Sequence, residues 1–304
     1  MSFPEVPRLS LDGLDELLEH YQIRCVLLYN RNPELQEKFN SSNTPDFYRY
    51  ADTEGVLYFR ELQETAIPFP ASKEMLTVSG ETDLRIFLDV GHQCYDAIRK
   101  HIPEEKDLRI LDFGVGCART MRHFYRTFQN YDLYGCDVDE AAIGYIQNSV
   151  PFIKATATGN NPPLPYESDY FDFIYSISVL THLNARALDE WVQELARITR
   201  PEGLVVPTIH GSTAFEEVLN NTKRRAVLGI KEDEFEAGLT SFRETGFCWM
   251  SQAAGSENID TDQYGICFID DENLEQLFGP TFKVLSHTKG EIEGWQDVVV
   301  LQKV

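Results

Sequence analysis

Short apolar runs alternate with amphipathic segments from about residue 108 to the end of the chain. The runs have the composition of strands buried on both faces, and the segments between them repeat apolar residues at helical spacing. We predict strands at 108–113, 131–136, 152–155, 171–176, 204–209, 282–285 and 297–301. We predict helices at 83–102, 117–128, 140–148 and 184–199. This alternation predicts the α/β class, with a Rossmann-like, doubly wound sheet that is mostly parallel and has an antiparallel C-terminal strand.

The segment 184–199 is the clearest helix in the sequence. Asn184 is a typical N-cap residue, and Pro201 and Gly203 end the helical pattern. The apolar residues that share one face of this helix are Leu188, Trp191, Val192, Leu195 and Ile198. Such a stripe predicts that the helix packs against the sheet.

Two regions do not follow the alternation. Residues 1–80 are rich in aromatic side chains, and 211–262 have the pattern of a mostly helical insertion. In parallel α/β sheets, ligands bind beyond the carboxyl ends of the strands, and both regions can build lids there. We therefore predict an N-terminal cap or lid at 1–80 and a main domain at 81–304, with an inserted helical lid at 211–262. The aromatic residues of the cap are expected to pack, with a binding pocket as the alternative.

Length and composition fit one large domain with an accessory segment, because 304 residues with 42% hydrophobic content can bury a full core. No apolar run is long enough to cross a bilayer, and residues 1–10 lack the apolar core of a signal peptide. We therefore expect a cytoplasmic protein without a membrane partner. The six cysteines include no CxxC pair, so we expect neither a metal site nor a disulfide framework.

The formal net charge of −22 changes the range of expected partners. Nucleic-acid binding draws much of its affinity from Lys and Arg side chains that displace counterions from phosphates. So acidic a chain is therefore not expected to bind nucleic acid. The basic cluster at 223–225 is expected to be a solvated helix face, with recognition of an anionic ligand as the alternative.

The candidate chemistry lies where the first predicted strand meets the next helix. Gly114 and Gly116 carry no side chain where a ligand must approach the backbone, and the helix start that follows offers free N–H groups. Asp137 ends the second predicted strand, where a carboxylate can accept hydrogen bonds from both hydroxyls of a ribose. A dinucleotide site requires glycine where this chain has Arg119, whereas a cation there fits a ligand with a carboxylate. The pattern therefore predicts a nucleoside site and argues against a nicotinamide dehydrogenase.

Five motifs follow one another along the chain: LDFGVGCAR at 111–119, GCDVD at 135–139, PPLPYESDYFDFIYSISVLTHL at 162–183, RITRPEGLVVPTIHG at 197–211 and QDVVVLQK at 296–303. This ordered set resembles the class I S-adenosylmethionine-dependent methyltransferases, in particular the bacterial small-molecule type. The resemblance covers about residues 79–304. The chain departs from the family pattern at Ala118 and Glu202, where the family has glycine.

The resemblance implies S-adenosylmethionine as the cofactor. Together with the residue pattern it predicts a set of cofactor-binding residues: Asp112, Phe113, Gly114, Gly116, Arg119, Asp137, Val138, Ser176 and Ile177. The glycine turn would line the methionine and ribose, Val138 the adenine, and Ser176 and Ile177 the transferring methyl group. Asp112 is expected to brace the loop by accepting backbone hydrogen bonds.

His182 and His210 are the candidate catalytic residues. Each follows a predicted strand at the same edge of the sheet, where a histidine can take a proton from a hydroxyl or an amine. The alternative for both is a histidine that is hydrogen-bonded inside the fold.

We therefore predict an enzyme that transfers a methyl group from S-adenosylmethionine to an oxygen or nitrogen atom of a small molecule, such as a sugar or a secondary-metabolite intermediate. One alternative keeps the cofactor and makes the acceptor a peptide or protein side chain, for which an open, flat groove is expected. Another is a non-catalytic protein that binds S-adenosylmethionine and uses its lids as partner surfaces. A homodimer is compatible with each of these predictions.

Overall fold

The computed structural model describes residues 70, 72–79, 84–105, 107–126, 130–150, 152–252 and 263–304. Most of the predicted N-terminal cap at 1–80 therefore lies outside the described residues, as does the end of the predicted lid at 253–262. Within the described ranges, no helix combines the length and the apolar character needed to cross a membrane.

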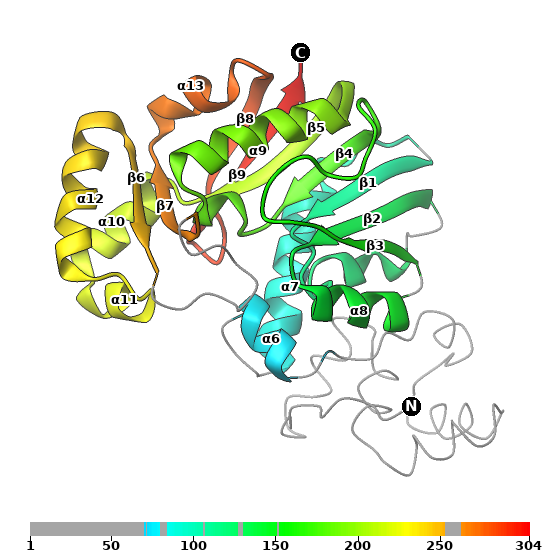
Figure 1. Ribbon diagram of the computed structural model, residues 1–304, viewed down its shortest axis with the longest axis horizontal. Coiled ribbons are helices and arrows are strands. Elements are labelled where there is room, and N and C mark those ends of the chain that lie inside the picture. Colours follow the sequence, from blue (N-terminus) through cyan, green and yellow to red (C-terminus); the bar gives the residue numbers. More distant parts are fainter. Residues whose placement is uncertain are drawn as a thin grey trace, which may run out of the picture.

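A seven-stranded sheet forms the centre of the molecule (Figure 1). Its strands are, in spatial order, β3 (Ile153–Ala157), β2 (Tyr131–Asp137), β1 (Leu108–Phe113), β4 (Phe171–Ser176), β5 (Thr199–Ile209), β9 (Gln296–Lys303) and β8 (Phe282–Ile292). The pairings from β3 to β5 are parallel, and β9 runs antiparallel to both of its neighbours. This order confirms the predicted Rossmann-like sheet with an antiparallel C-terminal strand.

Helices cover both faces of this sheet. Alternate residues of one strand point to opposite faces, and the strands carry apolar residues on both, so each face has to be buried under helices. On β4, Phe173 and Tyr175 contribute to one buried cluster and Ile174 to the other. The first cluster includes residues of α7 (Leu84–Arg99), η2 (Met121–Arg126) and α8 (Glu140–Ser149). The second includes residues of α9 (Ala185–Ile198) and α13 (Leu274–Phe278). The predicted cap of α9 is present, since the Asn184 side chain accepts a hydrogen bond from the Ala187 N–H at 2.9 Å.

The helix predicted at 117–128 is shorter than expected. Only η2, a 3₁₀ helix at Met121–Arg126, forms in the described part of this range. Gly116 and Ala118 both have positive φ angles, 51° and 60°. A left-handed residue cannot continue a right-handed helix, so the helical pattern of the sequence takes effect only beyond Ala118.

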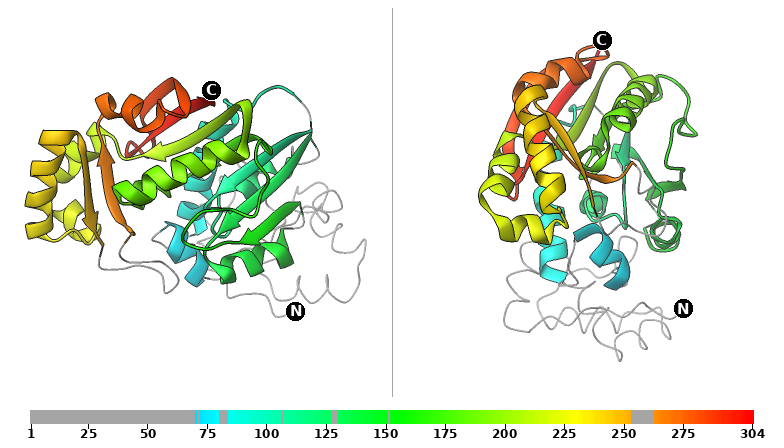
Figure 2. Two further views of the ribbon diagram at one scale, coloured as in Figure 1. Left: turned by 45° about the horizontal axis from the view of Figure 1, so that its top comes forward. Right: turned by 60° about the vertical axis from the view of Figure 1, so that its left-hand side comes forward.

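The predicted insertion forms a separate cluster at one end of the sheet (Figure 2). Its helices are α10 (Ser212–Asn220), α11 (Thr222–Val227) and α12 (Glu232–Thr245). They pack with a two-stranded antiparallel sheet of β6 (Phe247–Ser251) and β7 (Gly265–Ile269), which the sequence did not predict. Because β6 is only five residues long, the periodicity of its apolar residues fits a helix as well as a strand.

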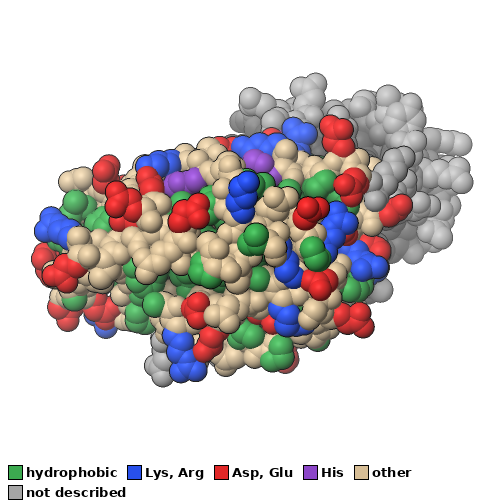
Figure 3. All heavy atoms as spheres, turned by 90° about the horizontal axis from the view of Figure 1, so that it is seen from above, with side chains coloured by type: hydrophobic (Ala, Val, Ile, Leu, Met, Phe, Trp, Pro, Cys, Tyr) green, Lys and Arg blue, Asp and Glu red, His purple; other side chains and the backbone are tan. Residues whose placement is uncertain are grey.

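The basic cluster at 223–225 is only partly a solvated face, because Lys223 is exposed whereas the two arginines pack against the protein. Arg225 is buried and donates hydrogen bonds to the backbone carbonyls of Val218, at 2.6 Å, and Leu219, at 3.2 Å. The guanidinium of Arg224 lies 4.2 Å from the centre of the Trp295 ring. These arginines therefore hold α10 and α11 against the rest of the insertion. On the face drawn in Figure 3, acidic and basic side chains are interspersed.

Candidate functional site

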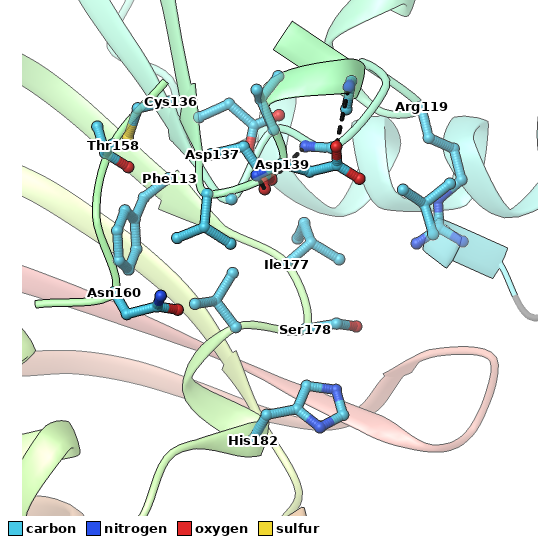
Figure 4. A pocket seen from close by; sticks show the side chains of 18 of the residues that line it. Phe113, Arg119, Cys136, Asp137, Asp139, Thr158, Asn160, Ile177, Ser178 and His182 are labelled. Atoms are coloured by element: carbon cyan, nitrogen blue, oxygen red, sulfur yellow. Dashed lines mark hydrogen bonds between the residues drawn. The ribbon is translucent and has the colours of Figure 1, made fainter. Parts of the chain in front are cut away.

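A cavity of about 330 Å³ opens at the carboxyl ends of β1, β2, β3 and β4 (Figure 4). Nine residues predicted for the site line it: Asp112, Phe113, Gly114, Gly116, Arg119, Asp137, Val138, Ile177 and His182. Ser176 and His210 are not among the lining residues. The structure therefore brings together predicted residues from three separate stretches of the sequence, 112–119, 137–138 and 177–182.

The glycine turn after β1 depends on the absence of side chains. Gly114 has φ of 84°, and a Cβ atom there would lie 2.1 Å from Cγ2 of Val179. Gly116 has φ of 51°, and a Cβ atom there would lie 2.5 Å from Cγ1 of Val78 on α6 (Ser72–Ser79). Larger residues would therefore strain the backbone and push apart the elements that form the cavity.

Asp137 holds the glycine turn in place. Its Oδ2 accepts a hydrogen bond from the Gly116 N–H at 2.7 Å, and its Oδ1 accepts one from the Asp139 N–H at 2.9 Å. Burial raises the pKa of Asp137, and these backbone hydrogen bonds oppose the rise. Each carboxylate oxygen retains capacity for a further hydrogen bond, so the side chain can also accept from hydroxyl groups in the cavity.

Asp112 and Ser176 lie deeper than Asp137. Asp112 is buried beside the cavity, and burial, together with the nearby Asp137, raises the pKa of Asp112 to about 8. Ser176 is fully buried, and its hydroxyl donates a hydrogen bond to the carbonyl oxygen of Phe113 at 3.0 Å. Ser176 therefore ties β4 to β1 and does not border the cavity, in contrast to its expected place near the methyl group.

The two ends of the cavity differ in chemistry. Thr158 and Asn160 lie on one side of Asp137, and the cationic side chain of Arg119 lies on the other (Figure 4). The sequence analysis missed residues 158–160, although they directly follow β3 and so reach the same edge of the sheet. It also missed Glu74 and Val78, because α6 belongs to none of the motifs.

Ser178 is a further lining residue that the sequence analysis missed. It has a positive φ of 58°, which is unusual for a residue with a side chain. Its N–H donates to the hydroxyl of Thr208 at 2.9 Å, and its own hydroxyl accepts from the Gln296 amide at 2.5 Å. Two other strands, β5 and β9, therefore hold this backbone in a conformation that isolated residues avoid.

His182 lies on the wall of the cavity opposite Asp137 (Figure 4). Its Nδ1 lies 2.6 Å from the carbonyl oxygen of Gly265. Because a carbonyl oxygen only accepts, Nδ1 carries the hydrogen and Nε2 carries the lone pair of the neutral ring. Burial lowers the pKa of His182 below 6.5, so the ring is neutral at pH 7. The ring stacks on that of Tyr264, with centres 4.4 Å apart.

His210 does not share this arrangement. It is buried, its Nε2 accepts a hydrogen bond from the Trp295 indole N–H at 2.9 Å, and its Nδ1 lies 3.2 Å from the Cys267 carbonyl oxygen. Both ring nitrogens are therefore occupied. Burial lowers the pKa of His210 to about 3. The expectation of a catalytic His210 is replaced by the alternative, a histidine that joins β5 to β7 and to the turn before β9.

The residues of the insertion stay outside the cavity. Among 211–252, the described part of the predicted lid, no residue lines it. The lining residue contributed by this end of the molecule is Tyr264, which follows the predicted lid. The Trp249 indole of β6 donates to the backbone carbonyl of His182 at 3.2 Å. The insertion therefore supports the wall of the cavity from behind.

Comparisons with known proteins agree with this geometry. Residues 110–203 match the family model of the methyltransferase domain. A malonyl-[acyl-carrier protein] O-methyltransferase from Halorhodospira halophila is 26% identical over 112 residues, or 36% of this chain. The chain spans 37% of the length of that relative.

Solved structures share the fold. The 1,6-didemethyltoxoflavin-N1-methyltransferase of Burkholderia thailandensis, solved with 1,6-didemethyltoxoflavin and S-adenosylhomocysteine, superposes with a TM-score of 0.51 at 13% identity, covering 78% of this chain and 92% of that one. The PH0226 protein of Pyrococcus horikoshii OT3 superposes with a TM-score of 0.50 at 14% identity, covering 70% of this chain and 89% of that one. With the motifs of the sequence, the matched family model identifies residues 110–203 as a class I methyltransferase domain, and the two solved structures show that the chain shares their fold.

Proposed function

We propose that this chain transfers the methyl group of S-adenosylmethionine to an oxygen or nitrogen atom of a small molecule, and that His182 is the general base. The observation that carries this proposal is the hydrogen bond between His182 Nδ1 and the Gly265 carbonyl oxygen. It leaves a neutral ring on the wall of the cavity, and Nε2 can take up a proton once the acceptor replaces the side chain of Gln252, which also hydrogen-bonds with this histidine. A general base must have its proton-accepting atom within reach of the acceptor and its pKa near or below the working pH.

The cavity fits the cofactor from end to end. The glycine turn offers a floor that any Cβ would fill, and Asp137 can accept from the ribose hydroxyls. In our proposal, Val138 and Asn160 contact the adenine, and the guanidinium of Arg119 binds the carboxylate of the methionine half. Ile177, which follows β4, borders the region of the transferring methyl group.

When bound, S-adenosylmethionine supplies an electrophilic methyl group on a positively charged sulfur. The residues of the chain hold the acceptor in line with that methyl group and exclude water. His182 Nε2 accepts the proton that the acceptor hydroxyl or amine loses as the new bond to carbon forms. Bound S-adenosylmethionine would supply the methyl group and would be released as the neutral thioether S-adenosylhomocysteine.

In this proposal the cofactor occupies the cavity, whose volume of about 330 Å³ lies near the lower end of the range for pockets that hold one small molecule. The preference for a small acceptor rests on the resemblance of the motifs to the bacterial small-molecule type. The malonyl-[acyl-carrier protein] relative favours oxygen over nitrogen as the acceptor atom, since that protein is an O-methyltransferase. The main domain at 81–304 would supply the chemistry and residues 1–80 would form its lid. The described part of the insertion, 211–252, lines no part of the cavity and would support its wall instead of covering it.

The experiment incubates the full chain with isotope-labelled S-adenosylmethionine and a fractionated metabolite extract. A labelled small molecule that gains one CH₂ group, together with S-adenosylhomocysteine, is expected. A His182→Asn variant serves as the control, because the Asn amide can still donate to the Gly265 carbonyl while the base is lost. Label in the protein fraction alone would favour a peptide acceptor, and failure of the wild-type chain to bind S-adenosylhomocysteine would overturn the proposal.

A further inference from the structure

Glu74 lines the cavity, and one of its two carboxylate oxygens has no hydrogen-bond partner among the described residues. It lies in the first turn of α6, and its Oε2 is buried. This oxygen accepts no hydrogen bond from Arg119 or from any other described residue. Buried acidic groups are rarely left unpaired, because an unpaired charge loses its hydration without compensation.

The position of α6 assigns Glu74 to one end of the cavity. Val78, on the same helix, packs where Gly116 has no side chain, and the Cys117 thiol lies 3.7 Å from the backbone carbonyl oxygen of Glu74. Helix α6 therefore lies directly against the glycine turn. In the proposed function this turn carries the methionine half of the cofactor, at the end of the cavity where Arg119 lies.

The charges of Arg119 and Glu74 both act on the pKa of the Cys117 thiol, so two side chains of opposite charge border the same end of the cavity. The methionine half of S-adenosylmethionine carries a carboxylate and an ammonium group on one carbon atom. Arg119 fits the carboxylate, and the carboxylate of Glu74 fits the ammonium group, which offers three donors. One amino-acid group would therefore pair both side chains at once.

We propose that Glu74 binds the ammonium group of the methionine half of S-adenosylmethionine. This inference rests on the proposed function, because it requires the cofactor to lie over the glycine turn. It makes α6 part of the cofactor site, although this helix precedes the residues that match the methyltransferase model.

The test compares two ligands by calorimetry on the full chain. S-adenosylhomocysteine carries the amino-acid group, 5′-methylthioadenosine lacks it, and neither carries a sulfonium charge. Glu74→Gln, which removes the charge with little change in shape, is expected to weaken S-adenosylhomocysteine binding by about tenfold or more. Binding of 5′-methylthioadenosine is expected to stay within about twofold of the wild type, since it makes no contact with Glu74.

Glu236→Gln is the matched control, because Glu236 is an exposed residue of α12 that does not line the cavity. It removes the same charge from the molecule and should leave both affinities unchanged. If Glu74→Gln does not fold, Glu74→Asp, which keeps the charge but shortens its reach, takes its place with the same expected contrast between the ligands.

Equal loss for both ligands would overturn the inference, because Glu74 would then act through the shape of α6. Unchanged binding of S-adenosylhomocysteine in Glu74→Gln would overturn it as well. Either result leaves the proposed methyl transfer standing. A wild-type chain that binds neither ligand would instead remove the proposed function itself.

Discussion

The glycine-turn side of the cavity and the His182 side are built in different ways. The first side is formed mainly by backbone, because two glycines leave open space and Asp137 accepts hydrogen bonds from the N–H groups of Gly116 and Asp139. The second side is formed mainly by side chains. His182 and Tyr264 stack, and the Trp249 indole holds the backbone of His182.

The two sides also differ in how far apart along the chain their residues lie. The glycine turn directly follows β1, and Asp137 ends the adjacent parallel strand β2, so both come from one stretch of the chain. His182 and Gly265 are 83 residues apart, and His210 and Trp295 are 85 residues apart. The glycine turn and Asp137 are therefore formed by one supersecondary unit, whereas the His182 side of the cavity forms only once the insertion has packed against the main sheet.

The largest effect is expected on the acceptor side. His182→Asn should lower kcat by roughly 10² to 10⁴, the usual contribution of a general base, because the Asn amide cannot accept the proton. Affinity for S-adenosylhomocysteine should not change. Steady-state rates and calorimetry on the same preparation measure both.

In the wild type, kcat/KM should be flat at neutral pH and fall below pH 6.5, since acid protonates Nε2 only below the lowered pKa of His182. A variant with full activity would remove His182 from the mechanism.

The next effect concerns the cofactor side. Asp137→Ala should weaken binding of the cofactor by a few kcal/mol at most, because each hydrogen bond to a charged group contributes roughly 1.5–3 kcal/mol. Unlike Glu74→Gln, it should weaken S-adenosylhomocysteine and 5′-methylthioadenosine alike, since both contain the ribose. Titration calorimetry with the two ligands checks this. Unchanged affinity for both would contradict the role proposed for Asp137.

A smaller effect is expected from His210→Phe. Loss of the acceptor for the Trp295 N–H should lower the free energy of unfolding by roughly 1–3 kcal/mol at pH 7, with cofactor affinity unchanged. Chemical denaturation measures the loss. A fall in kcat as large as that of His182→Asn would show instead that His210 acts in catalysis.

The same variant carries a prediction about pH. In the wild type the pKa of His210 is about 3 when folded, against 6.5 as the ordinary value. Between these pH values His210 binds a proton in the unfolded chain but not in the folded protein. The free energy of unfolding therefore falls as the pH falls from 6.5 toward 3. His210→Phe lacks this contribution, and its deficit relative to the wild type should therefore shrink in acid. A deficit that stays constant between pH 7 and pH 5 would contradict the lowered pKa.

The smallest effect is expected at Glu202, which lines neither side of the cavity and therefore serves as a reference for the other variants. Glu202 is exposed, has a positive φ of 63°, and stands where the family has glycine. Glu202→Gly should relieve this strain and raise the free energy of unfolding by up to about 1 kcal/mol, partly offset by the greater freedom of the unfolded chain. A thermal melt should show a small rise and ligand binding no change. A lower melting temperature would mean that the left-handed backbone carries little strain.

The sequence by itself determined the order of strands and helices in the main sheet, the glycine turn and the place of Asp137. It could do so because hydrophobic periodicity and glycine positions act within one element and its neighbours along the chain. The predicted start of the helix at 117–128 was wrong for a local reason. Ala118 has a left-handed backbone conformation, which hydrophobic periodicity does not reveal.

Only the tertiary structure decided between the two histidines. Both end up near the same edge of the sheet, with ring centres 6.4 Å apart, and the sequence treats them alike. The Gly265 carbonyl fixes the proton of His182 on Nδ1, whereas Trp295 and Cys267 occupy both nitrogens of His210. These partners, like α6 with Glu74, come from segments distant along the chain. A pattern along one element tells which face of it is buried, and cannot tell which distant donor or acceptor will meet it there.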